Sequence, residues 1–199
     1  MRCEKISWSQ VERLCLRLAN MIRESGYHPD IVIAIGRGGY VPARLVCDYL
    51  NLMNLTSIKI EHYLSGVNRQ KEAVIRYPLK IEIRNQKVLL VDDVNDTGDT
   101  LEVALRHLQT FQPAQVRTAV MHHKAVAHCK VNYYAKKVIR WRWLMYPWAV
   151  YEDISGFLMS QSQIPESLDE AQMLLLKRYN IDISLKRLGD IYTFMGWHS

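Results

Sequence analysis

One segment of the chain, residues 88–101, places an aliphatic strand directly before several carboxylates and a glycine turn. Its sequence is VLLVDDVNDTGDTL. The aliphatic run is short and rich in β-branched residues, which predicts a buried parallel strand, and the residues from Leu101 to Leu108 have helical spacing. We therefore expect a strand-to-helix turn over residues 92–100, with backbone N–H groups and a helix N-terminus directed at an anion.

The side chains of this turn suit a sugar phosphate. Thr97 and Thr100 supply hydroxyl donors, and Gly98 lets the backbone approach a phosphate closely. The preceding carboxylates would repel a bare phosphate, so they need hydroxyl groups, a protonated partner or a metal ion. A sugar phosphate meets both demands if its vicinal hydroxyls face Asp92 and Asp93.

Residues 88–101 resemble the binding motif for 5-phosphoribosyl pyrophosphate (PRPP) of the type I phosphoribosyltransferases. The family pattern is an aliphatic strand, two acids, two usually aliphatic residues, then Asp or Thr, Thr, Gly, a variable residue, and Thr or Ser. Two residues depart from it: Asn95 is polar where an aliphatic is usual, and Asp99 puts a charge into the phosphate loop. We expect Asp99 to point outward and cap the helix. An ordinary turn with acidic capping residues is the alternative interpretation.

A second glycine turn follows an apolar strand in residues 31–44, IVIAIGRGGYVPAR. Arg37 offers a fork of donors for phosphate oxygens, and Gly38 lets backbone N–H groups line up against them. A dinucleotide fingerprint would need glycine at 41, where Val41 stands. The segment resembles the pyrophosphate loop of the same family, in the form found in bacterial xanthine-guanine enzymes.

The stretch 103–151 contains no Asp or Glu but many cations. Within it, a strand predicted over residues 116–121 leads to Lys124. A lysine and an aromatic plane suit a 6-oxopurine, through the carbonyl oxygen and ring stacking. Resemblance to the xanthine-guanine and hypoxanthine-guanine enzymes implies that Lys124 binds purine O6, that Trp143 stacks on the base, and that the Leu144 backbone meets its C2 edge.

Other interpretations of these residues stay open. Trp141 and Trp148 are equally close candidates for stacking on the base, so the alternative for Trp143 is a tryptophan of the core or of an oligomer interface. The alternative for Lys124 is a solvated surface lysine. The cations and aromatics of this stretch also suit a nucleic-acid face. Some regulators of this fold bind RNA or DNA and retain a PRPP site, so such a regulator is the alternative function.

Helices and strands alternate along the chain, as in a doubly wound α/β sheet. The resemblance implies the type I phosphoribosyltransferase fold, a central mostly parallel sheet flanked by helices, with a small hood. We expect helices over about 7–23, 41–50 and 99–109, and strands over 31–35, 57–61, 74–83 in pieces, 88–92, 116–121 and 137–140.

We expect two domains. Residues 1–154 form the phosphoribosyltransferase domain, with a hood around 62–78 and 122–153, and residues 155–199 form a C-terminal helical appendage. The polar interval 62–72 lies where the family carries a loop that closes over PRPP, with Tyr63 near its start; a hydrophilic hairpin without a catalytic role is the alternative.

The appendage is predicted to hold two helices. Ser167 to Glu170 form a capping box that opens a helix to about Tyr179, and Ser184 begins a second helix that ends near Met195. Their apolar residues are more numerous than a lone hairpin needs. We expect them to pack on the domain or on a second subunit, and we expect a homodimer or a higher homo-oligomer.

Composition sets outer limits on the class of protein. With 199 residues, 49% of them hydrophobic, the chain can bury a sizeable core. The net charge of +6 suits anionic small-molecule substrates and is too mild to imply nucleic acid. The four cysteines lack metal-binding spacing and are expected to be reduced thiols of a cytoplasmic protein. No apolar run is long enough for a membrane span.

The resemblance implies a purine salvage reaction. A 6-oxopurine (guanine, hypoxanthine or xanthine) attacks C1 of PRPP in the presence of Mg²⁺, which releases pyrophosphate and forms a nucleoside 5′-monophosphate. We assign general acid/base work to Asp96, and Asp92 and Asp93 to the metal and the ribose. The family often has an acid after the stacking aromatic; Ala149 stands there, so Glu152 or Asp153 would substitute for it.

Overall fold

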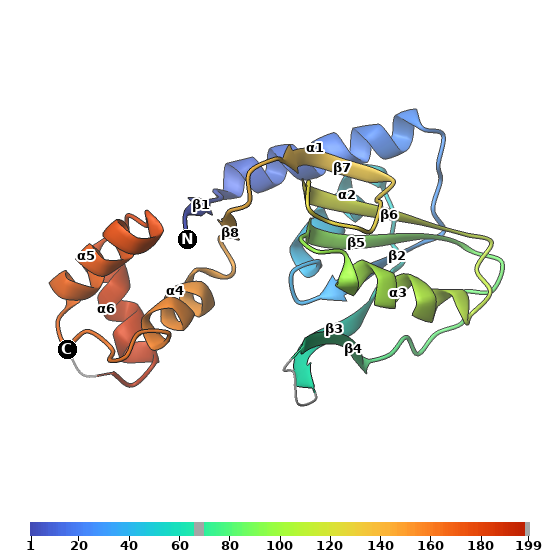
Figure 1. The fold of residues 1–199 in the computed structure, drawn as a ribbon. Coiled ribbons are helices and arrows are strands. Elements are labelled where there is room, and N and C mark those ends of the chain that lie inside the picture. Colours follow the sequence, from blue (N-terminus) through green and yellow to red (C-terminus); the bar gives the residue numbers. More distant parts are fainter. Residues whose placement is uncertain (66–69, 198–199) are drawn as a thin grey trace. The chain divides into compact units, whose positions relative to one another are not determined.

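The computed structural model describes residues 1–65 and 70–197 and divides into two compact units (Figure 1). One unit consists of residues 11–141, and the other joins residues 1–10 to residues 142–199. The first is called the sheet unit below and the second the helical unit. A domain boundary at residue 154 stays a prediction from the sequence.

The sheet unit is built on six strands in the order β4-β3-β2-β5-β6-β7. All neighbouring strands are parallel except β4, which runs antiparallel to β3. The expected α/β fold with a mostly parallel sheet is thereby confirmed. The strands are β2 (Ile31–Gly36), β3 (Leu55–Ser65), β4 (Gln70–Tyr77), β5 (Lys87–Asn95), β6 (Gln115–Lys124) and β7 (Tyr133–Val138).

Helices cover the sheet with apolar faces. A core cluster joins Ile33 of β2 and Leu90 of β5 to Leu101 and Leu108 of α3. Successive side chains of a strand point to opposite faces, so the intervening residues of β2 and β5 face the other way, and α2 packs on these same two strands. The helices are α1 (Trp8–Glu24), whose first turn lies in the helical unit, α2 (Tyr40–Leu50) and α3 (Asp99–Gln109).

Strand ends differ most from the sequence-based expectation. β5 continues three residues beyond residue 92, because Asn95 still pairs with His123 of the long strand β6. The last strand spans 133–138 instead of 137–140, because Tyr133 pairs with Ala119 of β6. Asp92 and Asp93 therefore belong to a strand, and the turn before α3 is short.

The helical unit contains the other strands and helices. β1 (Cys3–Lys5) and β8 (Trp143–Met145) pair in parallel, which the sequence analysis missed because each strand has only three residues. The capping box is borne out on one side, since Ser167 Oγ accepts the backbone N–H of Glu170 at 3.2 Å. The helices are α4 (Val150–Met159), α5 (Leu168–Tyr179) and α6 (Leu185–Phe194).

The helical unit has a hydrophobic core of its own. On α5 the buried side chains are Ala171, Leu175 and Tyr179, spaced four residues apart, while Met173 and Leu176 are half exposed. Along residues 1–65 and 70–197, no helix is long and apolar enough to cross a membrane.

Candidate active site

The carboxyl ends of the parallel strands β2, β5 and β6 carry the motifs that the sequence analysis selected. β5 lies between β2 and β6, so the segments that follow the three strands emerge at the same edge of the sheet. In open α/β sheets, ligands bind in the crevice outside this edge.

The turn between β5 and α3 depends on the glycine at position 98. Gly98 adopts a φ of 114° and precedes the first residue of α3, and a Cβ added to it would lie 2.6 Å from the backbone nitrogen of Cys129. Only glycine suits such a position. Asp99 lies in the first helical turn, where its Oδ2 accepts the Thr97 hydroxyl at 2.7 Å.

The loop between β6 and β7 is bonded to this turn. Asn95, which is 2% exposed, donates its side-chain N–H to the carbonyl oxygen of Cys129 at 2.8 Å. The backbone N–H of His128 donates to the carbonyl oxygen of Thr97, also at 2.8 Å. The polar residue in an aliphatic position was the sequence signal for this attachment, which we did not predict.

The glycine turn after β2 faces the carboxylates of β5. A Cβ added to Gly38 would lie 2.5 Å from Oδ2 of Asp93. The structure therefore brings the glycine turn against the Asp93 carboxylate of β5, with Gly38 as the residue that permits the approach. The side chain of Arg37 is exposed at this turn, and the peptide bond between Gly36 and Arg37 is cis.

Asp92 and Asp93 form a crowded pair of carboxylates. Asp92 is 7% exposed, and its Oδ1 accepts the backbone N–H of Asp93 at 2.9 Å. Burial, and secondly the negative charge of Asp93, raise the pKa of Asp92 well above its usual range. A nearby cation would relieve both effects, so this donor set fits a hard divalent ion such as Mg²⁺.

A preformed metal cluster is not visible in the described part of the chain, where no group of three or more His, Cys, Asp or Glu side chains converges. The two expected substitutes for the missing acid lie on α4 of the helical unit. Glu152 is exposed, and burial raises the pKa of Asp153 to about 6. Their use as metal ligands stays a prediction.

Lys124, at the end of β6, is buried and bonded to Asp96. Its ammonium lies 2.7 Å from Oδ2 of Asp96. The residue is only 2% exposed, which rules out the alternative of a solvated surface lysine. The indole N–H of Trp141 donates to the other Asp96 oxygen at 3.1 Å, and the Lys124 ammonium lies 4.4 Å from the centre of the Trp141 ring.

The other two residues expected to bind the base belong to the helical unit. Trp143 packs edge-on against Phe157 at 5.9 Å, and Leu144 is buried in β8. Among the described residues, neither Nε1 of Trp143 nor Oδ2 of Asp153 has a hydrogen-bond partner, although the indole is near enough to lower the pKa of that carboxyl group. The assignment of Trp143 and Leu144 to the base stays a prediction.

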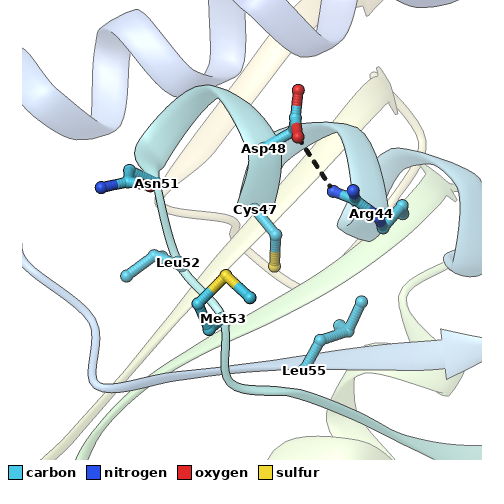
Figure 2. Close-up of a pocket in the computed structure, with 7 residues that line it drawn as sticks. All are labelled: Arg44, Cys47, Asp48, Asn51, Leu52, Met53 and Leu55. Atoms are coloured by element: carbon cyan, nitrogen blue, oxygen red, sulfur yellow. Dashed lines mark hydrogen bonds and ion pairs between the residues drawn. The ribbon is translucent and has the colours of Figure 1, made fainter.

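Of the interval 62–72, where a closing loop is expected, residues 62–65 end β3 and residues 70–72 begin β4, and these two strands pair. Residues 66–69 and the side chains of 62–71, that of Tyr63 included, lie outside the described residues. A pocket of about 200 Å³ elsewhere in the sheet unit lies beside the end of α2 and the start of β3 (Figure 2). It is at the amino-terminal end of β3, whereas the candidate site is at the carboxyl edge of the sheet. It is lined by Arg44, Cys47, Asp48, Asn51, Leu52, Met53 and Leu55.

Comparison with known proteins accounts for this arrangement of turns and carboxylates. Residues 7–153 match the phosphoribosyl transferase domain. The chain belongs to this family. Both turns and Lys124 fall within the matched range.

The phosphoribosyl transferase relatives include purine enzymes. The chain is 30% identical over 152 residues to a xanthine-guanine phosphoribosyltransferase of Ruegeria sp. strain TM1040, an alignment that covers 72% of this chain and 83% of the relative. A purine phosphoribosyltransferase of Pyrococcus horikoshii superposes with a TM-score of 0.66 at 30% identity, covering 74% of this chain and 94% of that one. A hypothetical protein of Neisseria gonorrhoeae with bound ppGpp has a TM-score of 0.67 at 27% identity, covering 87% and 95%.

We expect Gly38→Ala to weaken PRPP binding about tenfold to a hundredfold. The added Cβ would overlap the Asp93 carboxylate, and the shifts of backbone or side chain that remove such an overlap cost about 1–3 kcal/mol. Isothermal titration calorimetry with PRPP measures the change. Gly156→Ala, where nothing lies within 4 Å of the added Cβ, is the matched control and should bind PRPP like the native protein. Equal affinities of both variants would contradict the placement of PRPP at this turn.

Proposed function

We propose that this phosphoribosyltransferase is a purine salvage enzyme that transfers the 5-phosphoribosyl group of PRPP to a 6-oxopurine base. The base is guanine, hypoxanthine or xanthine, and the products are the nucleoside 5′-monophosphate and pyrophosphate. The observation that carries the proposal is the pair of Lys124 and Asp96, a buried ammonium beside a carboxylate at the edge where the phosphate turns lie.

The pair presents a donor next to an acceptor, and a 6-oxopurine has the complementary edge. Its carbonyl oxygen O6 accepts, and N7 beside it donates when it carries a proton. Lys124 can only donate, so it is assigned to O6, and Asp96 is assigned to N7–H. Adenine presents an amino group at C6, which opposes the lysine.

The two turns are assigned to PRPP. The backbone N–H groups and hydroxyls of the turn formed by Thr97, Gly98, Asp99 and Thr100 bind the 5′-phosphate, with help from the N-terminus of α3. Arg37 and the Gly38 turn bind the pyrophosphate. In the structure the Thr97 hydroxyl donates its one proton to Asp99, so this hydroxyl has to turn away from Asp99 in order to donate to the 5′-phosphate.

Catalysis in this proposal is mainly positioning and charge stabilisation. Departure of pyrophosphate leaves positive charge on the ribose, and Asp92 and Asp93 lie beneath it, against the ribose hydroxyls. These two carboxylates are also the assigned ligands of Mg²⁺, which when bound neutralises charge on the pyrophosphate oxygens. Asp96 takes the proton from N7 as the base attacks C1 of PRPP.

The relatives support a purine as the acceptor. The Ruegeria and Pyrococcus proteins are named as purine enzymes, and ppGpp in the Neisseria structure is a guanine nucleotide. The four cysteines are free thiols, which supports a reducing, cytoplasmic location. Half-exposed apolar side chains of the helical unit, among them Met173 and Leu176, support a homodimer or higher oligomer.

We expect Asp96→Asn to lower turnover by about 10²–10⁴ while PRPP affinity changes little, because an amide cannot take the proton from the base. Steady-state kinetics with guanine and with hypoxanthine, together with PRPP calorimetry, measure both quantities. Asp48→Asn on the exposed surface of α2 is the control for the loss of one carboxylate. Turnover at the native rate in Asp96→Asn would remove Asp96 from the mechanism.

Adenine should be the poorest purine substrate of the native protein. A buried donor that faces another donor costs about 1–3 kcal/mol, roughly tenfold to a hundredfold in kcat/KM. An assay of all four bases with PRPP and Mg²⁺, following pyrophosphate release, gives the order. Lys124→Ala should impair 6-oxopurine use and spare PRPP binding, whereas Lys130→Ala, at an exposed lysine of the following loop, should leave both native. Adenine as the best substrate would refute the proposal.

The alternative function is a PRPP-sensing regulator that binds nucleic acid, and it differs from the proposed enzyme in its expected activity on purines and its expected binding to nucleic acid. If the proposed enzyme is correct, the protein turns over a 6-oxopurine and shows no salt-dependent binding to RNA or duplex DNA below about micromolar at physiological salt. Fluorescence anisotropy over a salt series measures the binding. Tight, salt-sensitive binding without activity on any purine would establish the regulator instead.

A further inference from the structure

Trp141 follows β7 and reaches the residues assigned to the base. β7 ends at Val138, and the backbone N–H of Ala125 donates to the Val138 carbonyl oxygen at 2.9 Å. The ends of β6 and β7 are therefore joined next to Lys124. Three residues later, the indole ring lies over the lysine ammonium.

Trp141 differs from the other tryptophans in the kind of neighbour it has. Its ring faces a cation at 4.4 Å and its N–H donates to a carboxylate, although the residue is 47% exposed. An exposed aromatic with a purely structural role would be expected to pack on apolar side chains. Each of the other four tryptophans has an aromatic ring as neighbour: Trp8 and Trp148 lie against each other, Trp143 against Phe157, and Trp197 against Tyr192.

The two contacts of Trp141 restrict the motion of the Asp96 carboxylate and the Lys124 ammonium, the two groups assigned to bind the base. Without the indole N–H, Lys124 would be the one remaining hydrogen-bond partner of the Asp96 side chain among the described residues. The indole fixes the second oxygen, and the ring covers one side of the ammonium against water. A face of the aromatic ring attracts a cation, so the ammonium is held above the ring as well as beside the carboxylate.

We propose that Trp141 is a positioning residue of the base site, which holds the Asp96 carboxylate and the Lys124 ammonium in the orientation that meets N7 and O6 of a purine. The kinetic part of this inference rests on the proposed function. The geometric part does not, because it concerns how Trp141 covers Lys124.

Two substitutions separate the contacts. Trp141→Phe keeps an aromatic face for Lys124 and removes the hydrogen bond to Asp96, whereas Trp141→Ala removes both. We expect kcat to fall about tenfold in Trp141→Phe with little change in KM for the base, since a hydrogen bond to a charged group is lost. In Trp141→Ala the KM for the base should also rise about tenfold, and the KM for PRPP should stay native in both variants.

A second measurement is independent of activity. Lys124 is almost inaccessible, with 3% of its side chain exposed. Labelling by an amine-reactive reagent, quantified by mass spectrometry of the peptide that contains Lys124, should increase severalfold in Trp141→Ala and less in Trp141→Phe. Exposed Lys130 and Lys136 are internal standards in the same samples. Circular dichroism checks that each variant is folded.

Ile139→Ala is the matched control, because Ile139 lies two residues earlier in the same segment and is 79% exposed. It should keep native kinetics and native labelling of Lys124. Native kcat and KM in both Trp141 variants, or native labelling of Lys124 in Trp141→Ala, would overturn the role of Trp141. Absence of transfer to any purine by the native protein would instead refute the proposed function, and the labelling would still decide the inference on Trp141.

Discussion

The buried ammonium of Lys124 is the charge on which the candidate site depends. An ammonium taken out of water costs several kcal/mol unless a counter-charge and hydrogen bonds compensate it. Asp96 supplies the charge from the end of β5, and the Trp141 ring supplies a second favourable surface from beyond β7. Three segments separated in sequence are thereby tied to one point, and the strand β6 that carries Lys124 lies between the other two.

The parts predicted correctly are those with local signals. Around Gly98, the change from strand to helical spacing of apolar residues, the glycine and the hydroxyl side chains all occur within a few residues. The helix begins at Asp99 as expected. The glycine turn at Gly38 has an equally local pattern. Since parallel strands end at a common edge, the position of both turns at one edge of the sheet also followed from the fold class.

The missed parts depend on pairing between distant segments. The extension of β5 to Asn95 depends on pairing with the long strand β6. The strands β1 and β8 pair although they lie about 140 positions apart in the sequence, and each is too short to show an alternating pattern of apolar residues. Trp141 could not be distinguished from its neighbours by sequence, because three tryptophans occur within residues 141–148 and only the parallel pairing of β6 and β7 places one of them over Lys124.

The bonds from Asn95 to Cys129 and from His128 to Thr97 have a consequence for protein engineering. The loop that follows Lys124 is also a support of the phosphate turn. A loop transplanted from a relative with an aliphatic residue at position 95 is not shaped to place a carbonyl oxygen where that of Cys129 lies, and the Asn95 amide would then keep only Nδ1 of His123, 3.1 Å away, among its described partners. Base preference in this scaffold is therefore best altered by paired exchange of position 95 and the loop, because the two form a single exchangeable module.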